Sequence, residues 1–487
     1  MMSGDAILVI DLGTTSVRLS LVDEHGNVFT KFRAALPTFR ERPGEVVWDG
    51  NVIAQTVLKA ARAVSNEQAL MGIALATQRA SCLLWDAETS DPIGPVLSWS
   101  DGRTRQLDRD LRASGVRHTP GLSASKLRWL LDSIDPDRKA AHAGRIRGGT
   151  LDTWLAWILS SGKLHITDHT NASHTGIFNL SVLDWDSELT EMLNIPRNIL
   201  AYPLPSTGPF GNANALPGSP PILAISGDQQ ASLMGQGCVD QGTAKITFGT
   251  GGIINTIVGS RPLAETTRSA FANIAHSTQA GVIYGAETAI FSAGSAIEWL
   301  IRLGVLGKAG SIDNLVDPCH KSGTAIFVSA LDGLGAPYWK STARGAFMGL
   351  SSSDEPGDMV RAVLDGIVCA TADVLDRIEA DIQENLTNIS IDGGLSNSAA
   401  FCSILKATTN RSLHRAIHVE STTIGVAILA FQALGRVLPV ETEADTAAAI
   451  APAEGTIPAD RKAWADAIDL VLEDDARRKI RLDLISS

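Results

Sequence analysis

The chain has 487 residues, which at roughly 150 residues per domain predicts two or three domains. Charged residues make up 19% of it and hydrophobic residues 44%, a composition that excludes a disordered or fibrous chain. The formal net charge is −12 and no basic run occurs, which argues against nucleic acid and anionic membrane surfaces as partners.

The cysteines and the start of the chain indicate the compartment. We expect reduced, mostly buried thiols and no zinc site, because the cysteines are widely spaced and never form a C-x-x-C pair: Cys82, Cys238, Cys319, Cys369 and Cys402. The first residues lack a basic segment, and no apolar stretch approaches roughly 18 residues. These features predict a cytoplasmic protein without a membrane-spanning segment.

The beginning of the chain predicts an antiparallel meander. Residues 7–10 form an apolar strand, and residues 17–21 alternate between apolar and polar side chains, as a second strand does. The turn between them is Asp11-Leu-Gly-Thr-Thr-Ser16. A second turn at residues 24–27 leads into a third strand over 28–33.

Farther along, strand-like and helical patterns alternate, which favours an α/β fold with a mixed sheet. We expect strands at residues 72–76 and 83–86 and helices at 52–63, 126–132 and 150–160. After a proline-rich loop at 203–221 and a short strand at 222–225, residues 243–258 repeat the pattern of strand, Gly/Thr turn and strand. The repeat predicts two related domains, 1–238 and 239–487, the second ending in a docked amphipathic helix over 461–484.

The two Gly/Thr turns, at residues 13–15 and 249–252, are candidate anion sites. Glycine lets backbone N–H groups converge on a phosphate, and threonine hydroxyls add donors. Asp11, at the end of the first strand, is a candidate Mg²⁺ ligand acting through water. The alternative is that both turns are only tight connections within a sheet.

Asp228 and Arg79 each follow a predicted strand. The carboxylate of Asp228 precedes a helical run, where it can act as a catalytic base or simply cap the helix. Arg79 offers a guanidinium to substrate hydroxyls, although an arginine in such a place is often only a surface group.

Several common signatures are missing. The pairs His165/His169 and His414/His418 lack the glutamate of H-E-x-x-H, so we expect them on the surface. No phosphate-binding G-x-x-x-x-G-K-[ST], no G-x-S-x-G and no strand followed by G-x-G-x-x-G occurs. The P-loop, α/β-hydrolase and dinucleotide-binding classes therefore lose their main support.

Spaced motifs over nearly the whole chain resemble the FGGY family of carbohydrate kinases, within the actin-like ATPase superfamily. The branch that they resemble most is the glycerol kinases. The motifs are Asp11-Leu-Gly-Thr-Thr-Ser16, Thr77-Gln-Arg79, Leu151-Asp-Thr-Trp154, Thr167-Asp-His-Thr-Asn-Ala-Ser173, Gly227-Asp-Gln-Gln230, Gly249-Thr-Gly251, Leu334-Gly-Ala-Pro-Tyr-Trp339 and Asp392-Gly-Gly394. Residues 121–132 and 345–365 correspond to the two family signatures.

The resemblance implies two ribonuclease-H-like (actin-like ATPase) domains flanking a catalytic cleft. The first would bind a sugar or polyol and carry the first phosphate turn, and the second would mainly bind the nucleotide. It implies ATP as co-substrate with Mg²⁺, in-line transfer of the γ-phosphoryl group, and Asp228 as the base that accepts the hydroxyl proton. The family's ATP positions correspond to Thr14, Thr15, Ser16, Arg18, Thr250, Gly251, Gly294, Glu298, Gly394 and Ser398. Since relatives are often dimers or tetramers, a homo-oligomer is compatible with it.

The acceptor positions depart from the glycerol kinase pattern. Arg79, Trp99, Asp228 and Gln229 match it, whereas Ala80, Gly121 and Ile253 replace a Glu, a Tyr and a Phe. These replacements remove about 15 side-chain heavy atoms and two hydroxyl partners, so we expect a substrate larger than glycerol, such as a tetritol, pentitol or ketopentose. The alternatives are a true glycerol kinase with a refilled pocket, a xylulokinase-like enzyme, and a nucleotide-binding sensor without turnover.

Overall fold

The computed structural model describes residues 6–114, 122–264, 269–320, 323–416, 420–439 and 449–486. Within these ranges the chain divides into two compact units. Unit 1 comprises Met1–Gly235, Asn273–Tyr284 and His418–Glu441, and unit 2 comprises Gln236–Ala272, Gly285–Ile417 and Thr442–Ser487. The first change of unit falls near the predicted boundary at residue 238, and the chain later returns twice to unit 1.

Unit 1 is built on a mixed sheet with strand order β13-β14-β5-β1-β2-β3. Its strands are β1 (Ala6–Leu12), β2 (Ser16–Asp23), β3 (Val28–Ala35), β5 (Gly72–Thr77), β13 (Thr207–Asn212) and β14 (Pro221–Gly227). Strands β1, β2 and β3 form the predicted antiparallel meander. Strand β5 pairs in parallel with β1, and β14 pairs in parallel with β5.

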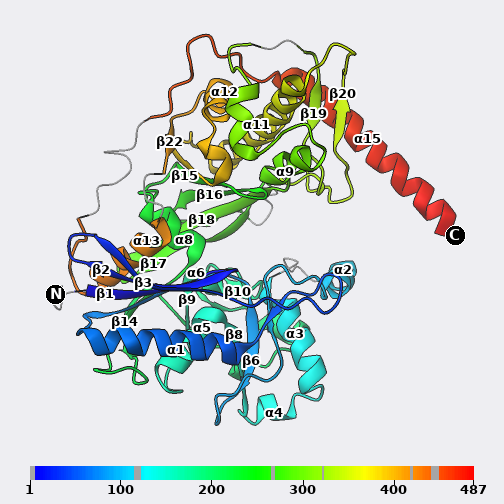
Figure 1. Cartoon of the computed structure of the whole chain (residues 1–487). Coiled ribbons are helices and arrows are strands. Elements are labelled where there is room, and N and C mark those ends of the chain that lie inside the picture. The colour runs from blue at the N-terminus through cyan, green and yellow to red at the C-terminus, as the bar shows by residue number, and fades with distance from the viewer. Residues whose placement is uncertain are drawn as a thin grey trace. The chain divides into compact units, whose positions relative to one another are not determined.

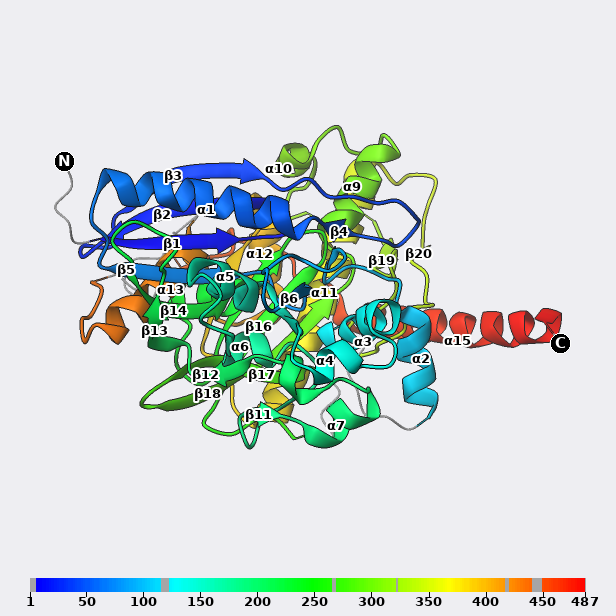
Figure 2. The same ribbon diagram turned by 90° about the horizontal axis from the view of Figure 1, so that it is seen from below.

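Helices cover both faces of this sheet, as Figure 1 shows. On one face lie α1 (Gly50–Glu67) and α5 (Leu151–Leu159), and on the other lie α8 (Asp228–Gly235) and α13 (Ser421–Ala433). Figure 2 shows α1 running along the strands β1 and β2. Because side chains alternate along a strand, β1 supplies Leu8 and Ile10 to the first core and Ile7 and Val9 to the second.

Helices α8 and α13 pack backbone against backbone. A Cβ atom at Gly425 would lie 1.7 Å from the carbonyl oxygen of Ala231, and one at Gly235 would lie 2.0 Å from that of Ser421. The hydroxyls of Ser232 and Ser421 also meet at 2.8 Å. Any larger residue at either glycine would force the helices apart.

A smaller sheet with strand order β4-β7-β6-β8 extends unit 1. Its strands are β4 (Val47–Trp48), β6 (Cys82–Asp86), β7 (Val96–Leu97) and β8 (Ile146–Thr150). Helix α3 (Ser123–Ile134), α4 (Lys139–His142) and η1 (Arg197–Ile199) contact this sheet. The other elements of unit 1 are α2 (Arg105–Ala113), α6 (His169–Ala172), α7 (Ser187–Met192) and the short strands β9 (Ile166–Asp168), β10 (Phe178–Asn179), β11 (Asp184–Trp185) and β12 (Tyr202–Leu204).

The surface position expected for one histidine pair is wrong. His165 packs edge-on against the rings of Trp85 and Trp157, and burial lowers its pKa to about 4. His169 is buried, and its Nδ1 lies 2.9 Å from the hydroxyl of Ser277. His165 is thus half-buried and His169 is buried. His418 of the second pair lies outside the described residues.

The sheet that carries the core of unit 2 has the strand order β17-β18-β16-β15-β21-β22, although its residues Asn273–Tyr284, in β17 and the start of β18, belong to unit 1. Its strands are β15 (Thr243–Phe248), β16 (Gly252–Gly259), β17 (Phe271–Thr278), β18 (Gly281–Ile290), β21 (Asn388–Asp392) and β22 (Leu413–Arg415), with β19 (Ile326–Val328) and β20 (Ala346–Met348) as a separate pair. Strand β15 pairs antiparallel with β16 and parallel with β21, as β1 does with β2 and β5. This matching arrangement confirms the internal repeat.

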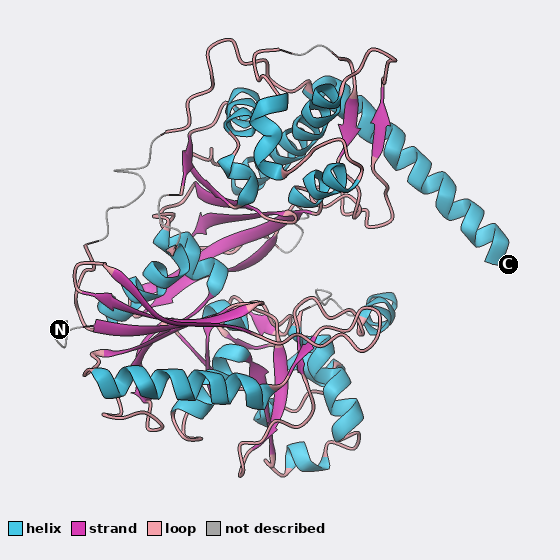
Figure 3. Cartoon of the chain, in the orientation of Figure 1, coloured by secondary structure: helices cyan, strands magenta, loops and turns pink. Residues whose placement is uncertain are grey.

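Helices pack on this sheet to form the core of unit 2, which Figure 3 shows coloured by secondary structure. They are α9 (Gly294–Arg302), α10 (Ile312–Leu315), α11 (Pro356–Ile382), α12 (Ala399–Thr409) and α15 (Arg461–Ser486), with the short turns η2 (Ala309–Ser311) and η3 (Gly394–Asn397). Helix α15 docks as expected, because Trp464 is buried and its Nε1 donates a hydrogen bond of 2.8 Å to Asp373. Its C-terminal part extends away from the rest of unit 2 (Figure 3).

Two further expectations concern the whole chain. The five cysteines are free, and of these only Cys319 is not buried among the residues that the structure describes. In the same ranges, no helix combines the length and apolar character needed to cross a bilayer.

Candidate active site

Three parallel strands of unit 1 end together and bring polar residues to one edge of the sheet. Asp11 of β1 lies in register with Ala76 of β5, and Gly227 of β14 lies in register with Thr77. The residues that follow at this edge are therefore Arg79 after β5 and Asp228 after β14. In open α/β sheets, ligands bind outside the carboxyl ends of such strands.

Asp11 is a half-buried carboxylate whose ionisation the protein opposes. Burial raises its pKa to about 6, and the negative charge of Asp228 adds to this effect, while Arg18 and Arg33 act against it. Arg18, which faces Asp11 across the β1–β2 pair, also forms an ion pair with Glu420. A cation beside Asp11 would stabilise the ionised form that burial and Asp228 disfavour.

The first Gly/Thr turn is fastened to the residues around Arg79. The N–H of Gly13 donates to the carbonyl of Ser16 at 3.0 Å, and the Gln78 amide donates to the carbonyl of Gly13 at 3.3 Å. The hydroxyl of Thr14 donates to Gln78 at 3.2 Å and accepts from the indole N–H of Trp99 at 3.1 Å. These contacts place the turn, which also contains Thr15, beside the candidate acceptor residues Arg79 and Trp99.

Asp228 and Arg79 form an ion pair in which Nε and Oδ1 are 3.5 Å apart. Helix α8 begins at Asp228 itself, so this residue lies in the first turn of the helix. The stem of Arg79 packs on Gly227, where a Cβ atom would lie 2.7 Å from its Cδ. Only glycine fits there without moving Arg79. Ala80 follows with a φ of 60° and a buried side chain, so the backbone turns sharply after the arginine.

The segment from Asp168 to His174 contacts Arg79 and the residue before Asp228. Its side chains are not among the predicted site residues. The carboxylate of Asp168 accepts hydrogen bonds from the backbone N–H groups of Thr170 and Asn171, from both of their side chains, and from Ser206. An Asp followed two and three residues later by polar side chains is typical of a helix N-cap. This pattern is the sequence signal by which the segment could have been identified.

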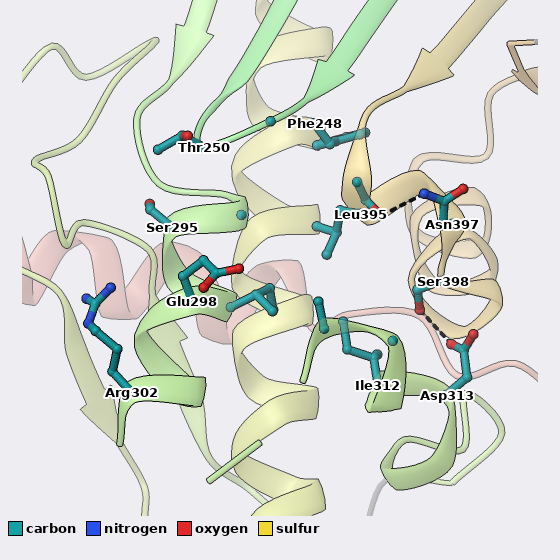
Figure 4. Close-up of a pocket in the computed structure, with 16 residues that line it drawn as sticks. Phe248, Thr250, Ser295, Glu298, Arg302, Ile312, Asp313, Leu395, Asn397 and Ser398 are labelled. Carbon is teal, nitrogen blue, oxygen red and sulfur yellow. Dashed lines mark hydrogen bonds between the residues drawn. The ribbon is translucent and has the colours of Figure 1, made fainter. Parts of the chain in front are cut away.

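A pocket of about 680 Å³ lies in unit 2, between the second Gly/Thr turn, α9 and η3 (Figure 4). Of the residues that the resemblance assigns to ATP, it brings together Thr250, Gly294, Glu298, Gly394 and Ser398. Gly251 adjoins it in the turn, and a Cβ atom there would lie 2.5 Å from the carbonyl oxygen of Ile290. Arg302 and Asp313 also line the pocket and had not been predicted.

The wall of the pocket is a close contact between the turn and the start of α9. The N–H of Gly294 donates to the carbonyl of Gly249 at 2.9 Å, and the N–H of Ser295 donates to that of Thr250 at 2.9 Å. A Cβ atom at Gly294 would lie 2.4 Å from the carbonyl oxygen of Gly249. The absence of a side chain at this residue is what lets α9 approach the turn.

Asp313 and Ser398 form the opposite wall (Figure 4). The Ser398 hydroxyl donates to Asp313 at 2.6 Å and accepts from the N–H of Phe401 at 3.1 Å, so it caps α12. Burial would raise the pKa of Asp313, but hydrogen bonds from Ser398 and from the backbone of Ala400 and Ala399 outweigh it and lower that pKa. Glu298 projects from α9 into the pocket between these walls.

The remaining predicted residues lie elsewhere. Ile253 is on β16 in unit 2 and is not among the residues that line the pocket, whereas Arg79, Ala80, Trp99, Asp228 and Gln229 belong to unit 1. Gly121 lies outside the described residues. Among the described residues, no cluster of three or more His, Cys, Asp or Glu side chains could hold a metal ion. A cation beside Asp11 would therefore keep waters or ligand oxygens, which is what Mg²⁺ prefers.

The chain is similar to proteins of known family. Residues 6–235 match the N-terminal domain of the FGGY family of carbohydrate kinases, and residues 244–434 match its C-terminal domain. A glycerol kinase of Petrotoga mobilis is 35% identical over 447 residues, which is 88% of this chain and 90% of the relative.

Solved structures share the fold. The crystal structure of Plasmodium falciparum glycerol kinase with ADP matches with a TM-score of 0.87 at 24% identity, over 96% of this chain and 98% of that chain. A ligand-bound xylulose kinase from Lactobacillus acidophilus matches with a TM-score of 0.79 at 21% identity, over 99% of both chains. These matches confirm the predicted α/β fold of actin-like ATPase type.

Proposed function

Since the chain belongs to the FGGY family of carbohydrate kinases and is a phosphotransferase, we propose that it transfers the γ-phosphoryl group of ATP to a hydroxyl of a polyol or ketose larger than glycerol. The observation that supports the acceptor half of this proposal is the pair of Asp228 and Arg79 at the ends of two parallel strands, next to the first Gly/Thr turn.

In the proposed reaction, Asp228 orients the attacking hydroxyl and accepts its proton as the new O–P bond forms and the bond to ADP breaks. Arg79 and Gln229 donate hydrogen bonds to other hydroxyl oxygens of the acceptor, and the exposed ring of Trp99 forms an apolar wall. Phosphate transfer needs little covalent help from a protein, so positioning and charge stabilisation carry the catalysis.

The nucleotide is proposed to lie in the pocket of unit 2, with its phosphates at the turn of Thr250 and Gly251. Thr14, Thr15, Ser16 and Arg18 are the further phosphate donors that the family resemblance proposes. The fit of Mg²⁺ to Asp11 is supported by the burial of this carboxylate and its repulsion by Asp228. When bound there, Mg²⁺ would neutralise phosphate charge, and Asp11 would hold it through water.

The size of the acceptor is inferred from the residues that replace larger ones. Ala80 carries no carboxylate beside Arg79, and Ile253 is smaller than the corresponding Phe. A small triol would then lack hydroxyl partners that a pocket for glycerol needs. The second candidate is glycerol itself, which is favoured by the name of the Petrotoga mobilis relative; a pentulose is the third, after the name of the xylulose kinase.

A substrate panel tests the proposal. ADP release is measured with ATP and Mg²⁺ against glycerol, erythritol, pentitols and pentuloses. We expect a four- or five-carbon acceptor to exceed glycerol by about tenfold or more in kcat/KM, equivalent to about 1.4 kcal/mol. A preference for glycerol would show that neighbouring side chains refill the space and would contradict the predicted size.

A valine at Gly394 tests the nucleotide pocket. A Cβ atom at this residue meets no atom within 4 Å, so Gly394→Val should leave the fold intact and occupy part of the pocket. We expect KM for ATP to rise by about tenfold or more while KM for the acceptor stays within about threefold. Gly307→Val is the matched control, because Gly307 is equally uncrowded and does not line the pocket. Equal KM values for ATP in both variants would place the nucleotide elsewhere.

A further inference from the structure

Arg79 has a neutral partner as well as the carboxylate of Asp228. Its Nη1 lies 2.5 Å from Nε2 of His174, which is 2% exposed and lies at the end of the segment that begins at Asp168. The guanidinium is thus held from two sides, by an imidazole and by a carboxylate. The motif Thr167–Ser173 ends just before His174, but it does not link this histidine to Arg79, which is 95 residues away in the sequence.

The hydrogen bonds of His174 determine which nitrogen carries its hydrogen. Nδ1 lies 3.0 Å from the backbone carbonyl of Thr170. The guanidinium of Arg79 can only donate, so Nε2 accepts through its lone pair and Nδ1 carries the hydrogen that it donates to the carbonyl. The Ser173 hydroxyl, 3.3 Å from Nδ1, donates to the same carbonyl. This arrangement requires the neutral imidazole, because a doubly protonated ring would direct an N–H at the guanidinium.

The same segment also holds Asp228 in place. The hydroxyl of Thr170 accepts a hydrogen bond of 2.8 Å from the N–H of Gly227, the residue before Asp228, and Thr170 itself is bound to Asp168. The carbonyl and the hydroxyl of this one threonine therefore connect to the arginine, through His174, and to the strand end that carries Asp228. The relative position of Arg79 and Asp228 depends on this segment.

We propose that His174 is a positioning residue of the acceptor site, which as a neutral Nδ1–H imidazole orients the Arg79 guanidinium toward the substrate without neutralising its charge. This inference rests on the proposed function. A carboxylate in the place of His174 would compensate the positive charge, whereas a neutral acceptor fixes the direction of the guanidinium and leaves its charge for Asp228 and for substrate oxygens.

Two amide variants separate the two hydrogen bonds of His174. The oxygen of glutamine in His174→Gln can reach the place of Nε2 and accept from Arg79. The shorter asparagine in His174→Asn reproduces only the donor to Thr170. We expect His174→Asn to lower kcat/KM for the acceptor by about tenfold or more, chiefly through KM, with KM for ATP unchanged, and His174→Gln to stay within about threefold of the wild type.

A double-mutant cycle with Arg79→Lys and an NMR measurement of the histidine tautomer complete the test. In an Arg79→Lys background, His174→Asn should have little further effect, because the two substitutions remove the same contact. Equal losses in the Asn and Gln variants, or full additivity with Arg79→Lys, would overturn the proposal. In protein labelled with ¹⁵N-histidine, NMR should show His174 as the Nδ1–H tautomer, with His174→Gln assigning the signal.

The NMR result does not depend on turnover. An Nε2–H tautomer would overturn the positioning role even in an active enzyme. A wild-type protein that releases no ADP with any acceptor would instead contradict the proposed function, whatever the tautomer of His174.

Discussion

Replacement of Asp228 by asparagine is expected to lower kcat by about 10²- to 10⁴-fold, the contribution of a positioned general base. Asparagine keeps the shape of the side chain and its place in the first turn of α8, but it cannot accept the hydroxyl proton. Because Asp228 lies in unit 1 and the nucleotide pocket lies in unit 2, we expect the affinity for ATP to stay within about threefold. Steady-state ADP release and equilibrium nucleotide binding measure the two effects separately.

The matched control for this variant is Asp240→Asn, the same chemical change at an exposed carboxylate. It should retain wild-type kcat. If Asp228→Asn also retained wild-type kcat, another group would have to take the proton, and Asp228 would be only a binding residue. A selective loss of ATP affinity in Asp228→Asn would assign the carboxylate to the nucleotide or its metal instead.

Replacement of Asp11 by asparagine is expected to have opposite effects on stability and on activity. The folded-state pKa of Asp11 is about 6, above its ordinary value of 3.8, so the folded protein favours the neutral form. The contribution of Asp11 to the free energy of unfolding is fully present below pH 3.8, its ordinary pKa, and is lost as the pH rises through about 6. Above about pH 7, ionised Asp11 costs the folded protein up to about 3 kcal/mol, which asparagine would avoid.

Without Mg²⁺, Asp11→Asn should therefore melt several degrees above the wild type near pH 8, and the difference should narrow as the pH is lowered toward 4. The same variant should lose about 100-fold or more in kcat, since the carboxylate is the proposed ligand of Mg²⁺ through water. Added Mg²⁺ with a non-hydrolysable ATP analogue should stabilise the wild type more than the variant.

Asp23→Asn, at the end of β2, is a control in which the expected change in stability has the opposite sign. Burial acts to raise the pKa of Asp23, but hydrogen bonds from Asn27 and His25 outweigh it, and the pKa is lowered. Stability from Asp23 is present above its ordinary pKa, so this variant should be slightly destabilised at neutral pH. A pH-independent difference between Asp11→Asn and the wild type would show that Asp11 ionises normally.

The fold could be predicted where local patterns determine it. Alternation at Val17, Leu19 and Leu21 predicted β2, and the apolar run before Gly227 predicted β14, because both strands bury one or both faces in the sheet. Periodicity located the centres of the helices better than their ends: α1 runs from Gly50 to Glu67, whereas the pattern gave residues 52–63. End positions depend on capping groups, such as Asp49 before α1, that a hydrophobic pattern does not contain.

The candidate site could be predicted as separate residues but not as contacts. Asp11, Arg79 and Asp228 stood out because each lies at or just after the end of a strand, and parallel pairing then brings them to one edge. His174 did not stand out, because its importance comes from a hydrogen bond to a residue far away in the sequence. Burial could not be read from the pattern either. The spacing of His165 and His169 predicted a surface residue, whereas His165 packs edge-on against the rings of Trp85 and Trp157.

The packing of α8 against α13 bears on how the protein is made. The hydroxyl of Thr422 donates to the carbonyl of Asp228 at 3.5 Å across 194 residues of sequence. Val426, Ala430 and Phe431 complete the core on that face of the sheet. During translation this apolar face thus stays uncovered until the ribosome has added most of the chain, a stage at which a chaperone would find it. The helix that carries the candidate base acquires its last neighbour only when synthesis is nearly finished.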